Sequence, residues 1–389
     1  MSDAILVLNA GSSTVKFGLF ERAPDGSQLL CKGLLDEHDA APKLTIKDSG
    51  GAVLFDKQQT TGNETALLDD ILHWVDGYLA SDELVAIGHR IVHGGQEFVA
   101  PVLIDDAVLD ALHALTPLAP LHQPRSLQPI RPIMTLRPEL PQIACFDSAF
   151  HHDLGPLARR FAIPRKFDAM GIRRYGFHGL SYQFIAHRLA ELSLSSKRSV
   201  VAHLGSGSSL CAMQDGASID TTMGLTALDG LMMGTRCGAI DPGVLLYLQQ
   251  VHGMPTDELE RMLYNESGLL GVSGLSADMR VLTGSDKPDA IAAVEMFVER
   301  AAKEIAAMAT SLGGIELLVF TGGIGEHSAE IRAKIAARLQ WLGVELDEAA
   351  NASSAETIAA DNSKVDVRII PTSEETSIAR DCVAVLVRR

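Results

Sequence analysis

Three segments rich in glycine, serine and threonine, at 9–14, 205–209 and 321–325, are predicted loops, and each follows an apolar run of the chain. Glycine lets several backbone amides point into one concavity, and hydroxyl groups add further donors, so such segments can bind phosphate oxygens. A single segment of this kind is more often an ordinary turn. Three of them favour phosphate binding, and the third precedes a helical pattern at 328–339 whose N-terminus would attract an anion.

Two arginines, Arg90 and Arg236, stand among glycines and apolar residues, where an arginine that only faces solvent is not expected. A guanidinium group binds a carboxylate or a phosphoryl group through two parallel contacts. Each arginine could instead form a structural ion pair. The pair is nevertheless typical of a site that handles a carboxylate and a phosphate.

Two carboxylates follow apolar runs: Asp147 comes after 143–146, and Glu374 comes shortly after 365–370. Carboxylates beside phosphate-binding segments can hold Mg²⁺ through one or two contacts, with water completing the coordination shell. The neighbourhood of Glu374 also has the pattern of a helix start, with Thr372 or Ser373 as the N-cap. The two interpretations are compatible.

The histidines suggest a second kind of chemistry. His122 and His178 lie in predicted loops among glycine, proline and aromatic residues, which favours a shaped site over a plain polar loop. His89 and His93 are four residues apart, but their neighbours favour strand and turn, and no H-E-x-x-H glutamate is present. A metal hydrolase remains an alternative, and it would use His89, His93, His151 and His152.

Several nucleotide-binding and catalytic motifs are missing. The sequence has no G-x-x-x-x-G-K-[ST], no G-x-G-x-x-G opening a helix near the N-terminus, no H-R-D-x-x-x-x-N and no G-x-S-x-G. These absences exclude P-loop enzymes and make Rossmann dehydrogenases, protein kinases and α/β-hydrolases unlikely relatives.

The elements that position these residues form two similar halves. Strand-like runs at 4–8 and 15–20 flank the first glycine segment, and a run at 199–204 precedes the second. Aligning Gly11 with Gly205 gives an offset of 205 − 11 = 194 residues, half the chain. With helical spacing at 64–79 and 289–312, this predicts a duplicated α/β architecture. Chance similarity of two turns is the alternative.

Length and composition agree with a two-domain soluble enzyme of 389 residues. A net charge of −16 disfavours nucleic acid and anionic membranes as partners. No run approaches the roughly 20 apolar residues of a membrane span, and no signal peptide is evident. Five scattered cysteines without a C-x-x-C pair predict reduced thiols and a cytoplasmic location.

Taken together, the sequence resembles the acetate kinases, a family of carboxylate kinases that share the fold of actin, sugar kinases and the Hsp70 ATPase. The resemblance covers nearly the whole chain, and its nine segments occur in order, which makes it highly specific. The segments are 9–16, 88–95, 119–124, 146–151, 175–179, 203–207, 233–236, 320–326 and 371–375.

This resemblance implies duplicated ribonuclease-H-like domains with mixed sheets and a cleft between them. Residues 1–148 plus 374–389 would form the N-terminal domain, and 149–373 a C-terminal domain carrying most of the nucleotide site. It also implies direct in-line phosphoryl transfer between ATP and acetate, which gives ADP and acetyl phosphate. Mg²⁺, or Mn²⁺ in its place, would serve as cofactor, and the enzyme would be a homodimer.

The resemblance also assigns roles to individual residues. Arg90 and Arg236 would grip the acceptor carboxylate and the transferring phosphoryl group, to which His178 would donate. The catalytic set is Asp147, Arg90, Arg236, His178 and His122. The nucleotide set is Asn9, Ser12, Thr14, Lys16, His203, Gly205, Ser206, Gly207, Asp278, Met279, Arg280, Gly322, Gly323, Ile324 and Gly325. The acceptor set is Arg90, Val92, Leu121, Phe177 and Ala227. Asn9 and Glu374 would hold the metal, with Asp147 beside them.

The sequence departs from the family pattern at a few positions. Ser206 replaces a common asparagine, and Ala227 replaces a proline that lines the acceptor pocket; Thr14 and Ser373 are milder changes. The smaller Ala227 could admit propionate, so a propionate or short-chain acyl kinase is the first alternative. A noncatalytic ATP-binding module is the second.

Overall fold

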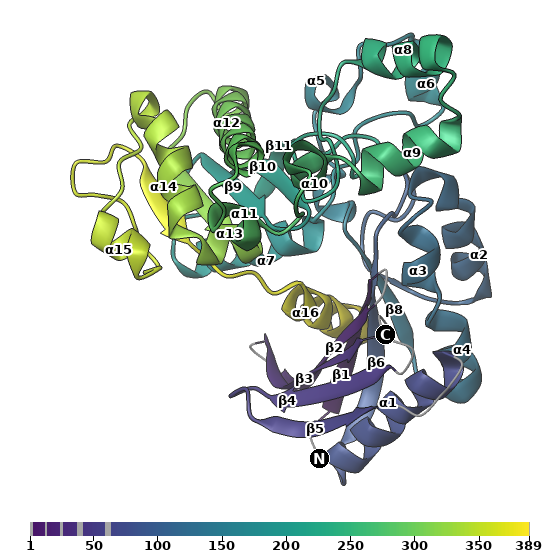
Figure 1. Ribbon diagram of the computed structural model, residues 1–389. Helices are drawn as coiled ribbons and strands as arrows, with labels where there is room; N and C mark the ends of the chain where they lie inside the picture. The colour runs from purple at the N-terminus through teal and green to yellow at the C-terminus, as the bar shows by residue number, and fades with distance from the viewer. Residues whose placement is uncertain (1–2, 12–13, 24–25, 37–41, 59–63, 389) are drawn as a thin grey trace. The chain divides into compact units, whose positions relative to one another are not determined.

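The computed structural model describes residues 3–11, 14–23, 26–36, 42–58 and 64–388 (Figure 1). The chain divides into two compact units. Unit 1 comprises Met1–His152 together with Ser373–Arg389, and unit 2 comprises Asp153–Thr372. The C-terminal segment therefore belongs to the same unit as the N-terminus. The division into functional domains at 148/149 and 373/374 stays a prediction.

The described part of unit 1 contains a mixed sheet of eight strands in the order β5-β4-β3-β2-β1-β6-β8-β7. β1, β6 and β8 run parallel to one another, and the other pairs are antiparallel. The strands are β1 (Asp3–Ala10), β2 (Thr14–Ala23), β3 (Gly26–Asp36), β4 (Lys43–Asp48), β5 (Val53–Gln58), β6 (Glu83–Ile91), β7 (Val102–Leu103) and β8 (Gln142–Phe146).

Helices cover both faces of this sheet, which explains why β1 is apolar along its length. Leu6 and Leu8 belong to the same buried cluster as the apolar face of α1. On the opposite face, a Cβ added to Gly88 would lie 2.5 Å from Ile378 Cγ2, so glycine is needed for α16 to approach β6. The helices are α1 (Glu64–Leu79), α2 (Asp106–Ala114), η1 (Thr116–Leu118), α3 (Gln123–Leu127), α4 (Ile130–Leu136), η2 (Ala149–His151) and α16 (Glu374–Val387).

Unit 2 contains a five-stranded mixed sheet in the order β11-β10-β9-β12-β13. β9, β12 and β13 are parallel, whereas β10 pairs antiparallel with both β9 and β11. The strands are β9 (Ser199–Leu204), β10 (Ser208–Gln214), β11 (Ala217–Thr221), β12 (Leu317–Thr321) and β13 (Asp366–Ile369). The helices are α5 (Pro156–Arg159), α6 (Arg165–Ala169), α7 (Gly179–Glu191), α8 (Pro242–His252), α9 (Thr256–Asn265), α10 (Gly268–Ser273), α11 (Met279–Thr283), α12 (Pro288–Ser311), α13 (Gly322–His327), α14 (Ala329–Arg338), η3 (Gln340–Leu342) and α15 (Glu348–Ala352).

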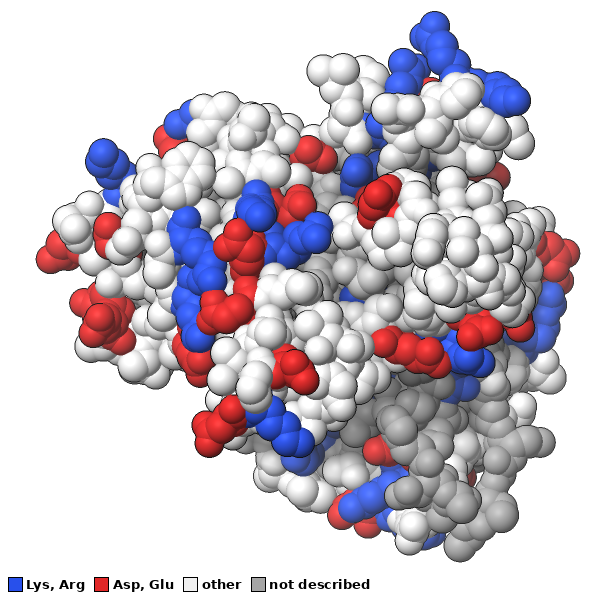
Figure 2. All heavy atoms as spheres, turned by 45° about the horizontal axis from the view of Figure 1, so that its top comes forward, with Lys and Arg blue, Asp and Glu red and all other residues white. Residues whose placement is uncertain are grey.

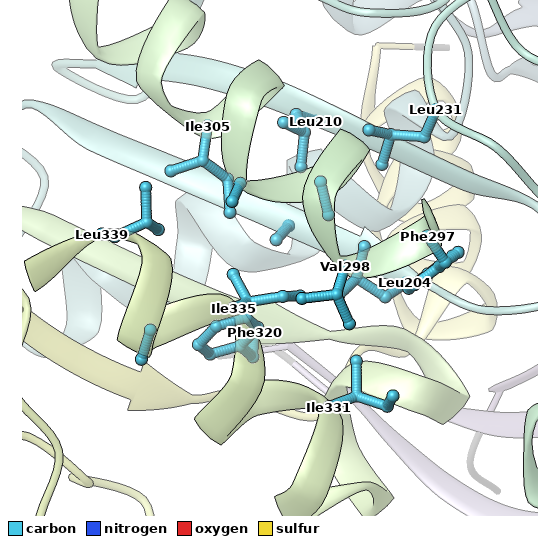
Figure 3. Packing of buried hydrophobic residues seen from close by; sticks show 14 of the residues in the cluster. Leu204, Leu210, Leu231, Phe297, Val298, Ile305, Phe320, Ile331, Ile335 and Leu339 are labelled. Atoms are coloured by element: carbon cyan, nitrogen blue, oxygen red, sulfur yellow. The ribbon is translucent and has the colours of Figure 1, made fainter. Parts of the chain in front are cut away.

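The core of unit 2 lies between one face of this sheet and the helices α12 and α14 (Figure 3). Leu204 and Leu210 from the sheet pack there with Phe297 and Ile335 from the helices. Successive strand residues point to opposite faces. His203 and Ser209, on the other face, therefore meet residues of α7, as their hydrogen bonds show.

The two sheets share one pattern of strands. The order β3-β2-β1-β6-β8 in unit 1 corresponds to β11-β10-β9-β12-β13 in unit 2, with three antiparallel strands followed by two parallel ones. Gly11 and Gly205 directly follow the corresponding strands β1 and β9. The duplicated α/β fold predicted from the 194-residue offset is therefore confirmed.

The starts of helices α16 and α13 test two predictions that were made from the sequence. Ser373 is the N-cap of α16, and its side chain accepts a hydrogen bond from the Thr376 amide, so one of the two predicted caps is confirmed. The predicted loop at 321–325 is wrong, because helix α13 begins at Gly322. Gly322 adopts a positive φ of 77°, and its amide donates to the Glu326 carboxylate, which closes this short turn.

Acidic and basic side chains are interspersed on the face of the molecule drawn in Figure 2. In unit 2, for example, Lys334 and Arg338 form ion pairs with Glu295 and Glu299 between α14 and α12. Within the described ranges, no helix has the length and apolarity required to cross a membrane.

Candidate active site

Three polar side chains of unit 1 gather where its parallel strands end. Asn9 and Arg90 are near the carboxyl ends of β1 and β6, and Asp147 directly follows β8. The register pairs Leu8 with His89 and Arg90 with Cys145, so the three strands end side by side. The carboxyl edge of parallel strands is where α/β folds bind ligands.

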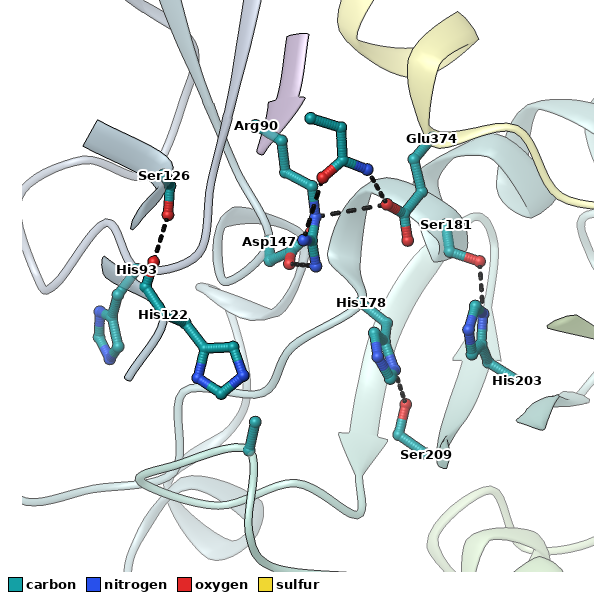
Figure 4. A network of polar contacts seen from close by, with 12 residues as sticks. Arg90, His93, His122, Ser126, Asp147, His178, Ser181, His203, Ser209 and Glu374 are labelled. Atoms are coloured by element: carbon teal, nitrogen blue, oxygen red, sulfur yellow. Dashed lines mark hydrogen bonds and ion pairs between the residues drawn. The ribbon is translucent and has the colours of Figure 1, made fainter. Parts of the chain in front are cut away.

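Arg90 is the centre of this group (Figure 4). Its Nη2 forms an ion pair with Asp147 Oδ2, and its Nε lies 3.3 Å from Glu374 Oε2. Its Nη1 donates to Asn9 Oδ1 at 3.4 Å. Asn9 Nδ2 in turn donates to Glu374 Oε2 at 3.4 Å, so all four residues are linked.

This group is largely withdrawn from water. The Asp147 side chain is 1% exposed, and that of Arg90 is 20% exposed. Burial disfavours the charged guanidinium, but the neighbouring charges of Asp147 and Glu374 outweigh it and raise the pKa of Arg90. Arg90 therefore stays charged and is held in one position. The pKa of Glu375 is also raised, first by burial and then by the charge of Glu374.

The acidic residues of this group are of the kind that supply some of the ligands of a magnesium ion. Mg²⁺ usually takes one or two carboxylates and completes its shell with water and substrate phosphates. Glu374, Asp147 and the Asn9 amide provide hard oxygen ligands of this kind. Among the described residues no group of three or more His, Cys, Asp and Glu side chains could hold a metal by itself. The residues fit Mg²⁺ as a partial ligand set that water and phosphate oxygens would complete.

A buried glutamine orders the loops beside this group. The Gln123 side chain accepts a hydrogen bond from the His93 amide and donates to the His93 carbonyl, both at 3.0 Å. It also donates to Leu112 O at 3.3 Å. Gln123 thereby ties the segment that follows Val92 to the start of α3, which His122 precedes.

Two of the four histidines of the hydrolase alternative, His89 and His93, form hydrogen bonds within unit 1. The Nε2 atom of His89 lies 2.7 Å from Gln142 Oε1, and burial lowers the pKa of His89 to about 4. His93 Nδ1 accepts a hydrogen bond from the Gly95 amide. With no group of three or more such ligands among the described residues, the metal-hydrolase interpretation gains no support from the structure.

In unit 2, His178 and His203 lie against each other. Their rings stack with centroids 4.3 Å apart. His178 Nδ1 is 2.9 Å from Ser209 Oγ (Figure 4). Ser209 Oγ is also 2.6 Å from the Tyr182 hydroxyl. His178 itself has a left-handed backbone with φ of 56°, directly before α7. Its imidazole is therefore oriented by a buried pair of hydroxyl groups.

Arg236 approaches the same place from the segment between β11 and α8. A Cβ added to Gly207 would lie 3.3 Å from His178 Nε2 and 3.8 Å from Arg236 Nη2. The glycine thus leaves both polar groups exposed to the space above it. Arg236 Nη1 donates to the Ala227 carbonyl at 2.9 Å, which fixes the other end of the guanidinium.

A pocket of about 870 Å³ opens beside this group in unit 2. It lies at the ends of β9 and β12 and at the start of α11. Its lining residues are Gly205, Ser206, Ala277, Asp278, Met279, Arg280, Thr283, Gly323, Ile324, His327 and Ser328. The carboxylate of Asp278 caps α11 and pairs with Arg280 at 2.6 Å.

The structure thus brings together many of the residues singled out from the sequence, within each unit. Asp278, Met279 and Arg280 share the pocket with Gly205, Ser206, Gly323 and Ile324. Phe177 and Val92 are buried, and Leu121 is 46% exposed. Lys16 and Thr14 lie on β2, while Ser12 falls outside the described residues. Their roles in binding stay predictions.

Other residues of these sites had no assigned role in the sequence analysis. Ala277, Thr283, His327 and Ser328 complete the pocket lining. Gln123 and Glu326 lie within the segments 119–124 and 320–326 that carry the family resemblance. Their place in these segments was a sequence signal that could have identified them.

Comparison with known proteins decides the family. The model of the Acetokinase family matches residues 4–380. This chain belongs to the acetokinase family. An acetate kinase of Rhodopseudomonas palustris is 49% identical over 389 residues, covering 98% of each chain.

Solved structures of the acetokinase family agree with the fold of this chain. A propionate kinase from Francisella tularensis is 39% identical, with a TM-score of 0.90 over 97% of this chain and 98% of that one. An acetate kinase from Porphyromonas gingivalis is 33% identical, with a TM-score of 0.87 over 99% and 100%. These relatives differ in the acceptor that their names state.

Proposed function

We propose that this protein catalyses reversible, Mg²⁺-dependent phosphoryl transfer between ATP and acetate, giving ADP and acetyl phosphate. The observation that carries the proposal is the arrangement around Gly207, where His178 and Arg236 meet a loop that also borders the large pocket. Family membership over nearly the whole chain supports it. Homodimerisation and a cytoplasmic location remain predictions from the sequence.

In the proposed reaction an acetate oxygen forms a bond to the γ-phosphorus while the bond from phosphorus to ADP breaks. Such transfer needs mainly correct position and positive charge around the phosphoryl oxygens. Arg236 supplies a fixed guanidinium, and Arg90 supplies another, which its carboxylate neighbours hold charged. Bound Mg²⁺, held by Glu374 and Asn9 with Asp147 nearby, would neutralise phosphate charge.

His178 is suited to donate to the phosphoryl group. When Tyr182 donates to Ser209, and Ser209 donates to His178 Nδ1, the proton of neutral His178 is on Nε2. That nitrogen faces the position above Gly207. Burial raises the pKa of Tyr182, so the tyrosine remains a hydrogen-bond donor throughout the neutral pH range.

The direct test is a hydroxamate assay for acyl phosphate, with ATP, Mg²⁺ and a panel of acetate, propionate and butyrate. Acetyl hydroxamate should form only when acetate and ATP are both present. ATP binding without any acyl phosphate would favour the noncatalytic ATP-binding alternative. Hydrolysis of ATP with no dependence on a carboxylate would also contradict the proposal.

Propionate is the second candidate acceptor, because Ala227 replaces a proline and one structural relative is a propionate kinase. We predict that Ala227→Pro lowers the kcat/KM ratio of propionate to acetate by about tenfold, the scale of one methylene in an apolar pocket. The Ala227 carbonyl that holds Arg236 is retained by proline. Ala227→Gly should shift the ratio the other way. An unchanged ratio in both variants would remove Ala227 from the acceptor pocket.

The stereochemistry of transfer tests the proposed single step. We expect inversion of configuration at phosphorus when ATP with a chiral γ-phosphoryl group reacts with acetate, because in-line displacement inverts once. The configuration of the acetyl phosphate, or of a secondary product made from it, gives the answer. Net retention would require a phosphoenzyme and two displacements.

Gln123 should contribute to acceptor binding by ordering the loops at Val92 and His122. We predict that Gln123→Ala raises the KM for acetate and destabilises the protein by roughly 1–3 kcal/mol, because buried His93 backbone groups lose their partner. Acetate saturation curves and urea unfolding measure both effects. Gln128→Ala is the matched control, since this glutamine is exposed and its side chain accepts a hydrogen bond from Arg125 on the surface of α3. Equal effects of the two variants would contradict the prediction.

A further inference from the structure

The Glu326 carboxylate joins two segments that are distant in the sequence. Its Oε1 accepts hydrogen bonds from the Gly322 amide at 2.8 Å and from the Thr321 hydroxyl at 3.3 Å, both at the start of α13. It also accepts from the Thr372 amide at 3.1 Å, 46 residues further along the chain. The side chain is 14% exposed. One oxygen therefore serves three donors in a mostly buried position.

Thr372 is held a second time through its hydroxyl group. Thr372 Oγ1 lies 2.8 Å from Ser181 Oγ, which is itself 2.9 Å from His203 Nδ1. Ser181 is fully buried on α7. Thr372 is thus tied by its amide to α13 and by its hydroxyl to the histidine pair.

The position of Thr372 in the chain gives these contacts a consequence. It is the last residue of unit 2. The next residue, Ser373, is the N-cap of α16, and Glu374 is the first residue of that helix. Thr372 is therefore joined to Glu374 by a backbone with only one intervening residue.

Glu326 itself is not among the residues that line the pocket. Gly323, Ile324 and His327, which surround it in α13, do line the pocket. A nucleotide in the pocket would contact these neighbours and so restrain the helix that carries Glu326. A hydrogen bond to a charged acceptor is roughly twice as strong as a neutral one, which suits a carboxylate to this linking role.

We propose that Glu326 and Thr372 are positioning residues that make the position of Glu374 depend on occupancy of the pocket by a nucleotide. The inference rests on the proposed function, since it takes the pocket as the nucleotide site and Glu374 as a metal ligand. It predicts coupling that passes through Thr372 by its amide and its hydroxyl.

Hydrogen exchange tests the coupling without any turnover. ADP, added with EDTA so that no metal is present, should slow exchange of the backbone amides at 373–377 in the unaltered protein. Glu326→Gln should remove most of that protection, and Thr372→Val, which keeps the amide bond to Glu326 but loses the hydroxyl contact with Ser181, should remove part of it. Glu330→Gln and Thr310→Val are matched controls, because both alter exposed side chains whose contacts stay within their own helices.

Kinetics separate positioning from a purely structural role. In Glu326→Gln, we expect kcat to fall about tenfold, the scale of one hydrogen bond to a charged group, and half-saturating Mg²⁺ to rise. Thr372→Val, which loses only a bond between two hydroxyl groups, should change both quantities in the same direction but by less. The dissociation constant for ADP in EDTA should stay close to that of the unaltered protein. The double variant should lose little more kcat than the more damaging of the two single substitutions, because both changes act through Thr372.

Three results would overturn the inference. These are an ADP effect on 373–377 that survives both substitutions, no ADP effect on that segment in the unaltered protein, and ADP affinity that falls as much as kcat. Failure of the proposed function looks different: acetate-dependent acyl phosphate would be missing from the unaltered protein, whatever the exchange data show.

Discussion

Replacing Arg236 by alanine should lower kcat by about 10²–10³-fold, the usual effect of removing one preorganised donor to a developing charge. The structure supplies the reason for preorganisation. Nη1 of Arg236 is held by the Ala227 carbonyl, while Nη2 faces the position above Gly207. No rearrangement is then needed as charge builds on the phosphoryl oxygens. Steady-state kinetics with saturating ATP and acetate measure the loss.

Two further variants sharpen this test. Arg236→Lys keeps the positive charge but loses the planar fork, so it should recover only part of the lost turnover. Arg261→Ala is the control, because this arginine is 60% exposed and pairs with Glu266 on the surface. Near-normal kcat in Arg236→Ala, with the control also normal, would remove Arg236 from the active site.

Replacing Arg90 by alanine should damage both stability and catalysis. Asp147 is 1% exposed and would lose its cationic partner, which typically destabilises a protein by roughly 3–5 kcal/mol. The same change removes a charged group from the proposed acceptor site, so kcat/KM for acetate should fall by at least about 10²-fold. Urea unfolding and acetate kinetics measure the two effects separately.

Controls distinguish the two roles of Arg90. Asp147→Asn combined with Arg90→Ala removes the uncompensated charge, so it should restore part of the stability without restoring activity. Arg131→Ala breaks an exposed ion pair with Asp106 and should change stability by less than about 1 kcal/mol. Full stability in Arg90→Ala would show that the pair with Asp147 does not hold this part of the fold.

A cycle of variants asks whether both arginines serve one reaction. When two groups stabilise the same transition state as a unit, their losses are strongly non-additive. Arg90→Ala with Arg236→Ala should therefore lose much less kcat/KM than the product of the single losses. Fully multiplicative losses would mean that the two arginines act independently.

Much of the fold could be predicted from the sequence because its signals are local. The apolar runs at 4–8 and 199–204 became β1 and β9, since buried parallel strands need side chains that suit both faces. The helical spacing at 64–79 became α1 with the same bounds. The glycine segments at Gly11 and Gly205 follow equivalent strands, so the duplication was visible before the topology was known.

The predicted loop at 321–325 failed for a physical reason that lies outside that segment. Glycines favour a loop by their flexibility, but here the Glu326 carboxylate captures the Gly322 amide and closes a helical turn. The same carboxylate also bonds the amide of Thr372. Propensity within the five residues could not reveal an acceptor whose partners lie elsewhere.

The sequence by itself determined the residue types, the strand and helix patterns, and the nine ordered segments that identify the family. Only the tertiary structure decided which groups share hydrogen bonds, as for Asn9 and Glu374, which are 365 residues apart, or Gln123 and the His93 backbone. The reason is that local patterns depend on neighbours along the chain. Partners of buried polar groups depend instead on the order and register in which strands and helices pack.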